Sequence, residues 1–344
     1  MRKALLEKVA AGRVLSSDEA REAGEALAAG RTEPLVTAAF LSGLSARGET
    51  AEELSGLASA FRAAMVPMEP FPRAVDTCGT GGDAKGTFNL STAAALAAAA
   101  LGAKVAKHGN RSVSSACGSA DLLERAGYPL AEPPAAASRR LRDKGFAFLF
   151  APAFHPAMAH VAPVRKALGV RTVFNLLGPL LNPARVGRQV VGVFDRGRME
   201  LMARSLRSLG TERSLVIHGE GGYDEAVLHG RTFVLEARSD AVESYDLGPE
   251  DFGLPAGSPE DLRGGSPEQN ARLFDGLLSG RASAALTAAV ASNAALALRA
   301  SGDREDLREG AGLALEALRS GRLRRYVESL LTDDREERRH AQVS

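Results

Sequence analysis

A glycine-rich segment with several polar side chains spans residues 75–92 and reads VDTCGTGGDAKGTFNLST. It lies between an expected strand, Arg73–Thr77, and an expected helix, Ser91–Leu101. Glycines at such a turn let backbone N–H groups approach an anion, and the start of a helix adds free N–H donors and a positive dipole end. The segment therefore predicts a loop that binds phosphate.

Two familiar phosphate-binding motifs fit this loop poorly. A Walker loop needs Gly-Lys-Ser/Thr, whereas residues 85–87 read KGT. Residues 79–84, GTGGDA, satisfy the loose dinucleotide fingerprint, but that fingerprint also needs an acid at the end of the next strand. The next expected strand, Lys104–Lys107, is followed by His108, and this basic end suits a phosphate better than a ribose diol. A nicotinamide-dependent dehydrogenase is therefore disfavoured.

A second polar loop, KHGNRSVSSACGS, covers residues 107–119. It combines Lys107 and Arg111 with four hydroxyl groups, those of Ser112, Ser114, Ser115 and Ser119. Such groups surround phosphate oxygens with charge-assisted hydrogen bonds. Two neighbouring phosphate loops predict a ligand with phosphates at both ends.

A third loop, GEGGYDEAVLHG, follows the expected strand Ser214–His218 and contains adjacent acids, Asp224 and Glu225. An acid pair on a loop is by itself more often simply solvated. Because this pair follows a strand opposite the phosphate loops, we expect it to hold Mg²⁺ beside a diphosphate, since Mg²⁺ prefers oxygen ligands.

The secondary structure expected to position these loops differs between the first 65 residues and the rest of the chain. The first 65 residues favour helices, and Ser16 with Glu19 and Thr50 with Glu53 have capping-box spacing. Beyond a proline-containing link, strands alternate with helices, which predicts a mainly parallel sheet covered on both faces. The remaining expected strands are Phe146–Phe150, Gln189–Phe194, and a later hairpin or edge pair, Phe233–Glu236 with Glu243–Asp246.

The predicted fold class is α/β, with a small N-terminal all-helical domain and a larger domain whose mainly parallel central sheet is flanked by helices. The expected domains are 1–70, with additional helices from about 155–185, and 71–330, followed by a charged tail at 331–344 that we expect to be frayed.

Composition excludes several classes of partner. The chain has 43 basic and 42 acidic residues, so no general attraction to nucleic acid is expected. Its most apolar run, Ala93–Ala103, is about half the length of a membrane span. Cys78 and Cys117 match no zinc or redox spacing. These features predict a soluble cytoplasmic protein.

Longer stretches of the sequence resemble the anthranilate phosphoribosyltransferases of tryptophan biosynthesis. The matching segments are DTCGTGGD, KGTFNLST, KHGNRSVSS, GSADLLE, FHPAMAHVAPVRKALGVRTVFNLLGPLLNP and GYDEAV. Matching is dense from Asp76 to Pro183 and thinner, but collinear, from the N-terminal helices to about Tyr326. The first two loops also occur, in looser form, in pyrimidine-nucleoside phosphorylases, so the block from Phe154 to Pro183 is the specific part.

The resemblance implies transfer of a phosphoribosyl group from phosphoribosyl pyrophosphate to the amine of anthranilate, the second step from chorismate to tryptophan. It implies Mg²⁺ as cofactor and a homodimer joined through the helical domain. The implied phosphoribosyl pyrophosphate ligands are Gly79, Gly82, Asp83, Thr87, Asn89, Leu90, Ser91, Thr92, Lys107, His108, Gly109, Asn110, Arg111, Ser112, Val113, Ser114, Ser115 and Ser119. The implied anthranilate contacts are Gly79, His108, Asn110, His155, Arg165 and Pro179, and the implied metal ligands are Ser91, Asp224 and Glu225.

Physical reasoning agrees with the implied amine site. Arg165 can hold a benzoate carboxylate through two parallel hydrogen bonds that a lysine cannot reproduce. No general base is assigned, because the aniline nitrogen becomes acidic once it attacks. The chain departs from the family pattern at Ala84, Ala116, Ala159 and Ala226-Val227. The alternatives are a pyrimidine-nucleoside phosphorylase and a non-catalytic relative that binds nucleic acid.

Overall fold

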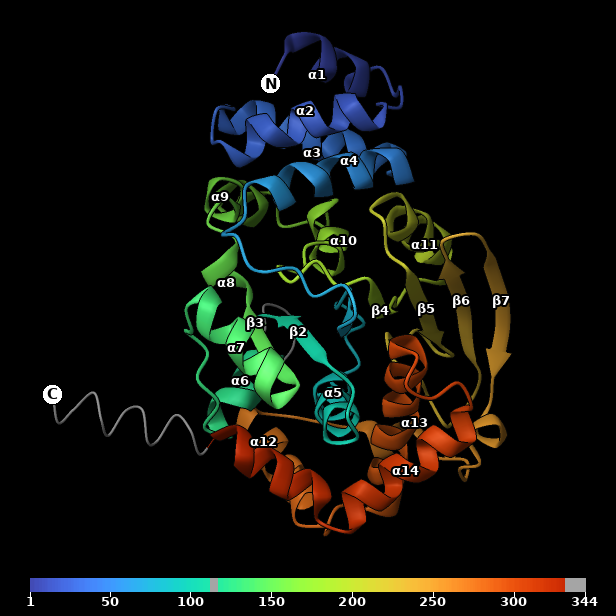
Figure 1. The fold of residues 1–344 in the computed structure, drawn as a ribbon. Helices are drawn as coiled ribbons and strands as arrows, with labels where there is room; N and C mark the ends of the chain where they lie inside the picture. The colour runs from blue at the N-terminus through green and yellow to red at the C-terminus, as the bar shows by residue number, and fades with distance from the viewer. Residues whose placement is uncertain (112–116, 332–344) are drawn as a thin grey trace, which may run out of the picture.

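The computed structural model describes residues 1–111 and 117–331. Four N-terminal helices form a bundle at the top of Figure 1: α1 (Lys3–Ala10), α2 (Ser17–Ala28), α3 (Pro34–Arg47) and α4 (Ala51–Ala63). The two predicted capping boxes are present. Ser16 Oγ accepts from the Glu19 N–H at the start of α2, and Thr50 Oγ1 accepts from the Glu53 N–H at the start of α4. These caps satisfy N–H groups that a helix start otherwise leaves unpaired.

Below the bundle lies a seven-stranded sheet in the order β3-β2-β1-β4-β5-β6-β7. Its strands are β1 (Val75–Gly79), β2 (Val105–Gly109), β3 (Phe146–Phe150), β4 (Arg188–Gly192), β5 (Arg213–Gly219), β6 (Thr232–Arg238) and β7 (Val242–Leu247). The first five strands pair in parallel, which confirms the predicted α/β fold class. β6 and β7 pair antiparallel at one edge, as the predicted hairpin requires.

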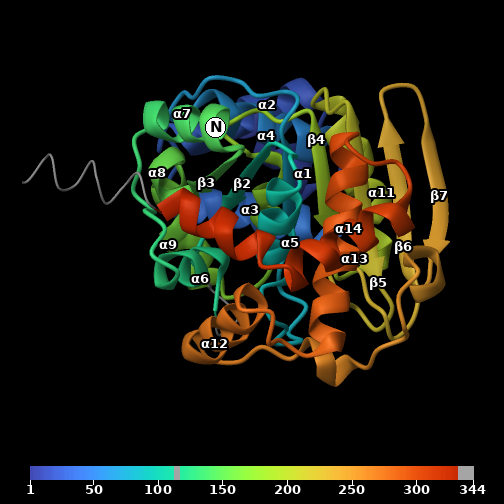
Figure 2. The ribbon, with the colours of Figure 1, turned by 60° about the horizontal axis from the view of Figure 1, so that its bottom comes forward.

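Helices cover both faces of this sheet (Figures 1 and 2). One face packs on α5 (Leu90–Ala100), α13 (Ala284–Ser301) and α14 (Leu307–Arg319), through a core that includes Val190 and Leu215. The other face packs on α11 (Met199–Ser208) and the helical bundle, through a core that includes Val191 and Val216. Successive residues of β4 and β5 thus point to opposite faces, and both faces are apolar, as expected of a doubly covered parallel sheet. The other helices of this domain are α6 (Ser119–Arg125), α7 (Pro134–Lys144), α12 (Pro267–Leu278) and a last helical segment at 322–331.

The segment between β3 and β4 leaves the sheet and joins the helical bundle. It forms α8 (Ala151–Phe154), α9 (Met158–Leu168), α10 (Phe174–Leu177) and the 3-10 turn η1 (Gly178–Leu180). α9 packs against α2 and α3, and the Phe174 ring lies edge-on to Phe61 of α4, with ring centroids 5.2 Å apart. The bundle is therefore anchored to the sheet domain by a chain segment that both begins and ends in the sheet.

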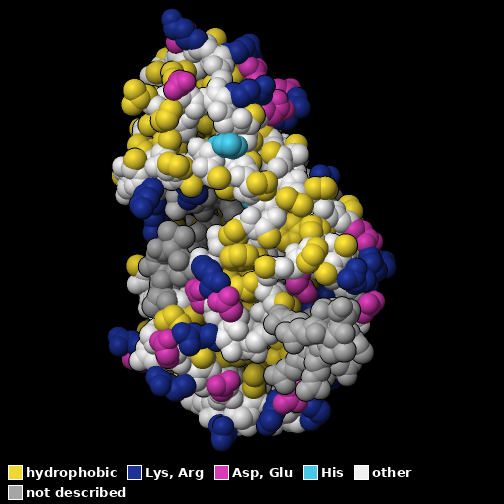
Figure 3. Space-filling model, turned by 90° about the vertical axis from the view of Figure 1, so that its left-hand side faces the viewer, with side chains coloured by type: hydrophobic (Ala, Val, Ile, Leu, Met, Phe, Trp, Pro, Cys, Tyr) yellow, Lys and Arg dark blue, Asp and Glu magenta, His cyan; other side chains and the backbone are white. Residues whose placement is uncertain are grey.

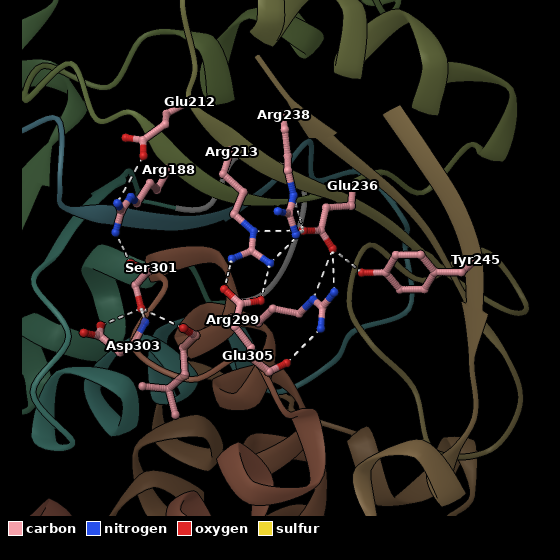
Figure 4. Close-up of polar contacts among 11 residues, drawn as sticks. Arg188, Glu212, Arg213, Glu236, Arg238, Tyr245, Arg299, Ser301, Asp303 and Glu305 are labelled. Atoms are coloured by element: carbon pink, nitrogen blue, oxygen red, sulfur yellow. Dashed lines mark hydrogen bonds and ion pairs between the residues drawn. The ribbon is translucent and has the colours of Figure 1, made fainter. Parts of the chain in front are cut away.

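A buried carboxylate ties the antiparallel edge of the sheet to α13 (Figure 4). Glu236 of β6 is fully buried and receives hydrogen bonds from Arg213, Arg238, Arg299 and Tyr245. Burial alone would raise the pKa of Glu236, but the Tyr245 hydroxyl and the Arg213 guanidinium lower it to about 2. Because the charge is fully hydrogen-bonded, this cluster fixes β5, β6, β7 and α13 relative to one another.

Across the described ranges, no helix is both long and apolar enough to cross a membrane.

Candidate functional site

The three polar loops meet at the carboxyl edge of the parallel strands. β1 ends at Gly79, β2 at Gly109 and β5 at Gly219, so the loops that follow them emerge on the same side. Ligands of open α/β sheets bind at this edge. The structure brings the first loop and the Asp224-Glu225 loop into direct contact.

The contact between these two loops requires glycine at its centre. The Gly81 N–H donates a hydrogen bond of 3.0 Å to Asp224 Oδ2. A Cβ atom on Gly79 would overlap the Asp224 carboxylate and lie 2.9 Å from its Cγ. Gly81 and Gly82 have φ values of 65° and 82°, which residues with side chains rarely adopt. The glycines therefore let the loop touch the acid through its backbone.

Glu225 lies deeper than Asp224 and reaches the start of α5. It is 8% exposed, and its Oε1 accepts from the Ser91 N–H at 3.3 Å. Burial, followed by the nearby charges of Asp224 and Asp83, raises the pKa of Glu225 well above its usual value. Burial and Asp83 also raise the pKa of Asp224 to about 7. Two adjacent acids at such a site favour a compensating cation.

The donor set fits Mg²⁺. Two oxygens, Oε2 of Glu225 and Oδ2 of Asp83, are buried and have no hydrogen-bond partner among the described residues. Within the same ranges, no group of three or more His, Cys, Asp or Glu side chains gathers to hold a metal. Mg²⁺ commonly binds through one or two carboxylates and substrate phosphates rather than through an all-protein cage. The residues present therefore suit a metal that is shared with a diphosphate.

Lys107 places a positive charge behind this site. It is 2% exposed, and its Nζ donates to the Thr77 carbonyl at 2.5 Å and to Ser91 Oγ at 3.3 Å. Burial lowers the pKa of Lys107, and the charge of Asp76 opposes that change. Burial raises the pKa of Asp76 to about 6 against the opposing charge of Lys107. The Lys107 ammonium group thus lies beneath Ser91, turned toward the protein interior.

Asp76 in turn fixes the neighbouring strand and loop. Its Oδ1 accepts from the His108 N–H at 3.2 Å, and its Oδ2 accepts from Asn182 Nδ2 at 2.8 Å. Asn182 also donates to the Ala106 carbonyl at 2.7 Å. This buried network connects β1, β2 and the residues after η1.

The second polar loop, residues 107–119, forms hydrogen bonds with α6 where the structure describes it. Arg111 donates to both carboxylate oxygens of Glu124, at 2.6 and 2.8 Å, and to Asp121 at 3.1 Å. Ser119 Oγ donates to the Asn110 carbonyl at 3.3 Å. Acidic side chains thus hold the Arg111 guanidinium predicted to bind phosphate. Of the predicted ligands in this loop, Ser112, Val113, Ser114 and Ser115 lie outside the described residues, as does Ala116.

The other predicted ligands of the first loop lie at the start of α5. Asn89 is the N-cap residue of α5, and its Nδ2 donates to Asn270 Oδ1 at 3.3 Å. Leu90 and Thr92 are fully buried, and Thr92 Oγ1 has no hydrogen-bond partner among the described residues. Thr87 forms an isolated bridge with Arg263.

Two histidines line the region predicted for the amine. Nε2 of His108 lies 3.1 Å from Nε2 of His155. Burial and the neighbouring ring lower the pKa of His108 to about 3, and burial lowers that of His155 to about 4. The His108 ring meets the backbone of Gly178 in η1, and the His155 ring meets that of Leu181 directly after it. Pro179, between them in the chain, is buried. The region therefore offers neutral rings near physiological pH.

Arg165 lies on α9, with its guanidinium carbon 5.3 Å from the centroid of the Phe174 ring. The guanidinium group has no hydrogen bond or ion pair with any residue that the structure describes, and burial lowers its pKa. No hydrogen bond joins it to Gly79 or Asn110 within those residues, so their shared contact with anthranilate stays a prediction. An unpaired, half-buried arginine is suited to binding a carboxylate.

The sequence reasoning missed Arg171, which links the helical bundle to the glycine loop. Its guanidinium donates to the Gly82 carbonyl and lies 4.1 Å from the centroid of the Phe194 ring. Ser45 of α3 donates to the Arg171 carbonyl at 3.2 Å. Arg171 belongs to a block that resembles the family, but no spacing rule marks it as a partner of the glycine loop.

The fold and the site define an α/β protein whose glycine loop and acid pair lie at the carboxyl edge of its sheet, with N–H donors suited to a diphosphate and oxygens suited to a divalent cation. The family model described as "Glycosyl transferase family, helical bundle domain" matches residues 3–65, and that described as "Glycosyl transferase family, a/b domain" matches residues 71–323. An anthranilate phosphoribosyltransferase of Geobacillus kaustophilus is 46% identical over 320 residues, which cover 93% of this chain and 94% of the relative. The chain belongs to the anthranilate phosphoribosyltransferase family.

Solved structures agree with this assignment. The crystal structure of anthranilate phosphoribosyltransferase from Thermus thermophilus is 47% identical, with a TM-score of 0.90 and coverage of 95% of this chain and 98% of that one. The Saccharomyces cerevisiae enzyme in complex with phosphoribosyl pyrophosphate and Mg is 28% identical, with a TM-score of 0.86 and 96% of each chain covered. A second structure of the yeast enzyme, in complex with 4-fluoroanthranilate, is 27% identical, with a TM-score of 0.85 and coverage of 95% and 96%.

Proposed function

We propose that this chain transfers the phosphoribosyl group of phosphoribosyl pyrophosphate to the amine of anthranilate, giving N-(5-phosphoribosyl)anthranilate and diphosphate in tryptophan biosynthesis. The observation that carries the proposal is the contact of a glycine loop with an acid pair, Gly81 N–H to Asp224 Oδ2 at 3.0 Å. The loop supplies donors for a diphosphate, and the acids supply oxygen ligands for a cation. Family membership, and the substrates bound in the yeast structures, support the same reaction.

The leaving group determines the chemistry of the first site. As the C1–O bond of the ribose breaks, negative charge grows on the diphosphate and positive charge grows on the sugar. Backbone N–H groups at Gly81 and Ser91 are positioned to stabilise that negative charge, with Lys107 adding positive potential from behind. Bound Mg²⁺, held by Ser91, Asp224 and Glu225, would supply further charge neutralisation at the diphosphate.

The amine side requires binding and orientation rather than proton abstraction. Arg165 would hold the anthranilate carboxylate. The side chains that would contact the anthranilate ring are those of His108, His155 and Pro179. The amine nitrogen forms its bond to ribose C1 as the diphosphate leaves, and its proton passes to solvent. Both histidine pKa values lie far below neutrality, so neither ring repels the developing sugar cation.

We propose further that the chain forms a homodimer through its helical domain. Hydrophobic side chains gather on the upper part of the face shown in Figure 3, where the helical bundle lies. Among the described residues, the large apolar side chains exposed on this bundle and its associated segment are Val14, Leu35 and Val170, and Leu35 is 85% exposed. A contiguous exposed apolar surface can mark an interface between chains, and these side chains are proposed to belong to one. Cytoplasmic location is proposed with it, and the two free cysteines are compatible with a reducing compartment.

The test is an activity assay in which each component is left out in turn. Purified protein is mixed with anthranilate, phosphoribosyl pyrophosphate and Mg²⁺, and the loss of anthranilate fluorescence is followed. The expected result is a loss that needs all three components and disappears with EDTA. Absence of turnover at every Mg²⁺ concentration, together with phosphorolysis of a pyrimidine nucleoside, would overturn the proposal in favour of a nucleoside phosphorylase.

A further inference from the structure

Asn293 is a polar residue in the middle of α13, a helix built mainly from alanine and other apolar residues. It is 7% exposed, and α13 packs against α5 beneath the sheet (Figure 2). A buried amide is unfavourable in such a core unless its hydrogen-bonding groups are paired. The partners of Asn293 therefore indicate what the amide does there.

Within the part of the chain that the structure describes, both bonds that Asn293 makes outside its own helix go to one residue, Ala226. The Ala226 N–H donates to Asn293 Oδ1 at 3.0 Å, and Asn293 Nδ2 donates to the Ala226 carbonyl at 3.0 Å. The second N–H of the amide donates to the Ala289 carbonyl at 2.9 Å, within α13. The side chain thus satisfies both backbone groups of Ala226, as a neighbouring strand would.

Ala226 immediately follows the acid pair, and the backbone of that pair is held closely on its other sides. A Cβ atom on Gly192 would overlap the Asp224 backbone, and one on Gly219 would lie 2.5 Å from the Glu225 carbonyl oxygen. Asn293 also lines the same small cavity as Ser91, Asp224 and Glu225. The acid pair is therefore confined between two strand ends and one helix side chain.

We propose that Asn293 is a positioning residue for the metal site: by binding both backbone groups of Ala226, it fixes the backbone that presents the carboxylates of Asp224 and Glu225 to the cation. The inference rests on the proposed metal site. Partners that orient metal ligands typically change metal affinity or activity by about 10- to 100-fold when they are removed. Asn293 makes none of the predicted ligand contacts itself, so its effect is indirect.

The variants separate this role from simple core packing. Asn293→Ala removes both bonds to Ala226. Asn293→Ser also removes them, but leaves a hydroxyl that can bond the Ala289 carbonyl, as serine commonly does within helices. Ser292→Ala is the matched control, because Ser292 is also buried in α13 and, among the described residues, its hydroxyl bonds only the Ala289 carbonyl, at 2.9 Å.

The measurement is Mn²⁺ binding by electron paramagnetic resonance in the presence of inorganic pyrophosphate, with thermal unfolding in EDTA recorded for each variant. Both Asn293 variants are expected to weaken Mn²⁺ binding by about 10- to 100-fold. Ser292→Ala should bind Mn²⁺ within about twofold of the unchanged protein, as expected of a residue outside the metal's surroundings. If Asn293→Ala does not fold, Asn293→Ser decides the question.

The experiment distinguishes failure of the positioning role from failure of the proposed metal site. Unchanged Mn²⁺ binding by the folded Asn293 variants, with Asp224→Ala abolishing it, would overturn the positioning role and leave the metal site intact. Unchanged binding by Asp224→Ala would show instead that the proposed metal site is wrong.

Discussion

Replacement of Arg165 by alanine should weaken anthranilate binding selectively. The Arg165 guanidinium has no hydrogen bond or ion pair with the described residues, so its donors are available for a ligand carboxylate. A hydrogen bond to a charged group contributes about 1.5–3 kcal/mol. Since about 1.4 kcal/mol corresponds to a tenfold change in affinity, the expected rise in the KM for anthranilate is about 10- to 100-fold.

The assay is steady-state kinetics by anthranilate fluorescence, with each substrate varied at saturation of the other. The KM for phosphoribosyl pyrophosphate should change by less than about twofold, because Arg165 is not among its predicted ligands. Arg165→Lys keeps the charge but loses the planar pair of donors, so we expect an intermediate KM for anthranilate. Lys166→Ala, one residue along the same helix and exposed, is the control and should leave both constants unchanged.

Equal increases in the two KM values for Arg165→Ala would refute the reasoning, because they would indicate a general disturbance of α9 rather than loss of a carboxylate contact. A KM for anthranilate that stays within twofold of the original would remove Arg165 from the amine site altogether.

Three further outcomes are expected. Gly79→Ala should lower kcat/KM by about 100-fold, because the added Cβ would displace the Asp224 carboxylate; an unaltered kcat/KM and Mg²⁺ requirement would contradict this. Asp224→Asn should stabilise the metal-free protein at pH 8 but not at pH 4. The folded pKa of Asp224 is about 7 and its unfolded value is near 4, so ionisation of this acid destabilises the folded protein as the pH rises from about 4 to about 7. A lower melting temperature than the original at pH 8 would count against it. Ala84→Gly should raise the free energy of unfolding in urea by about 1 kcal/mol, because Ala84 has a φ of 56°; a decrease would show that the backbone there is unstrained.

The strands were predictable where apolar residues alone define them. Phe146–Phe150 has the predicted limits, since a continuous apolar run is bounded by glycine and by the start of α8. β1 and β2 extend two residues beyond their predicted ends, to Gly79 and Gly109. Pairing with neighbouring strands keeps these residues extended although glycine has a low strand propensity.

The residues that line the site were predictable from motifs, whereas the residues that hold them in place were not. The glycine loop and the Asp224-Glu225 pair were found because glycines and acids stand out at strand ends. Asn293 and Asn182 are single amides without characteristic spacing, and their partners lie 67 and 106 residues away. Only the folded chain shows which backbone group a lone amide satisfies. The departure from the family pattern at Ala84 likewise shows its physical consequence only in the folded chain, where this residue has a left-handed backbone.

The Gly81 N–H donates to Asp224, and the Ser91 N–H donates to Glu225. Through these bonds the acid pair would compete with a diphosphate ligand for the same N–H groups. The two carboxylates occupy the donors that we propose for the diphosphate. A diphosphate arriving alone must displace them and face their charge, whereas carboxylates that turn toward a cation release the donors at the same moment. Cation and diphosphate therefore each remove an obstacle to the other. Metal-free substrate should accordingly be a poor ligand, and the protein should stay unoccupied whenever the cation is scarce.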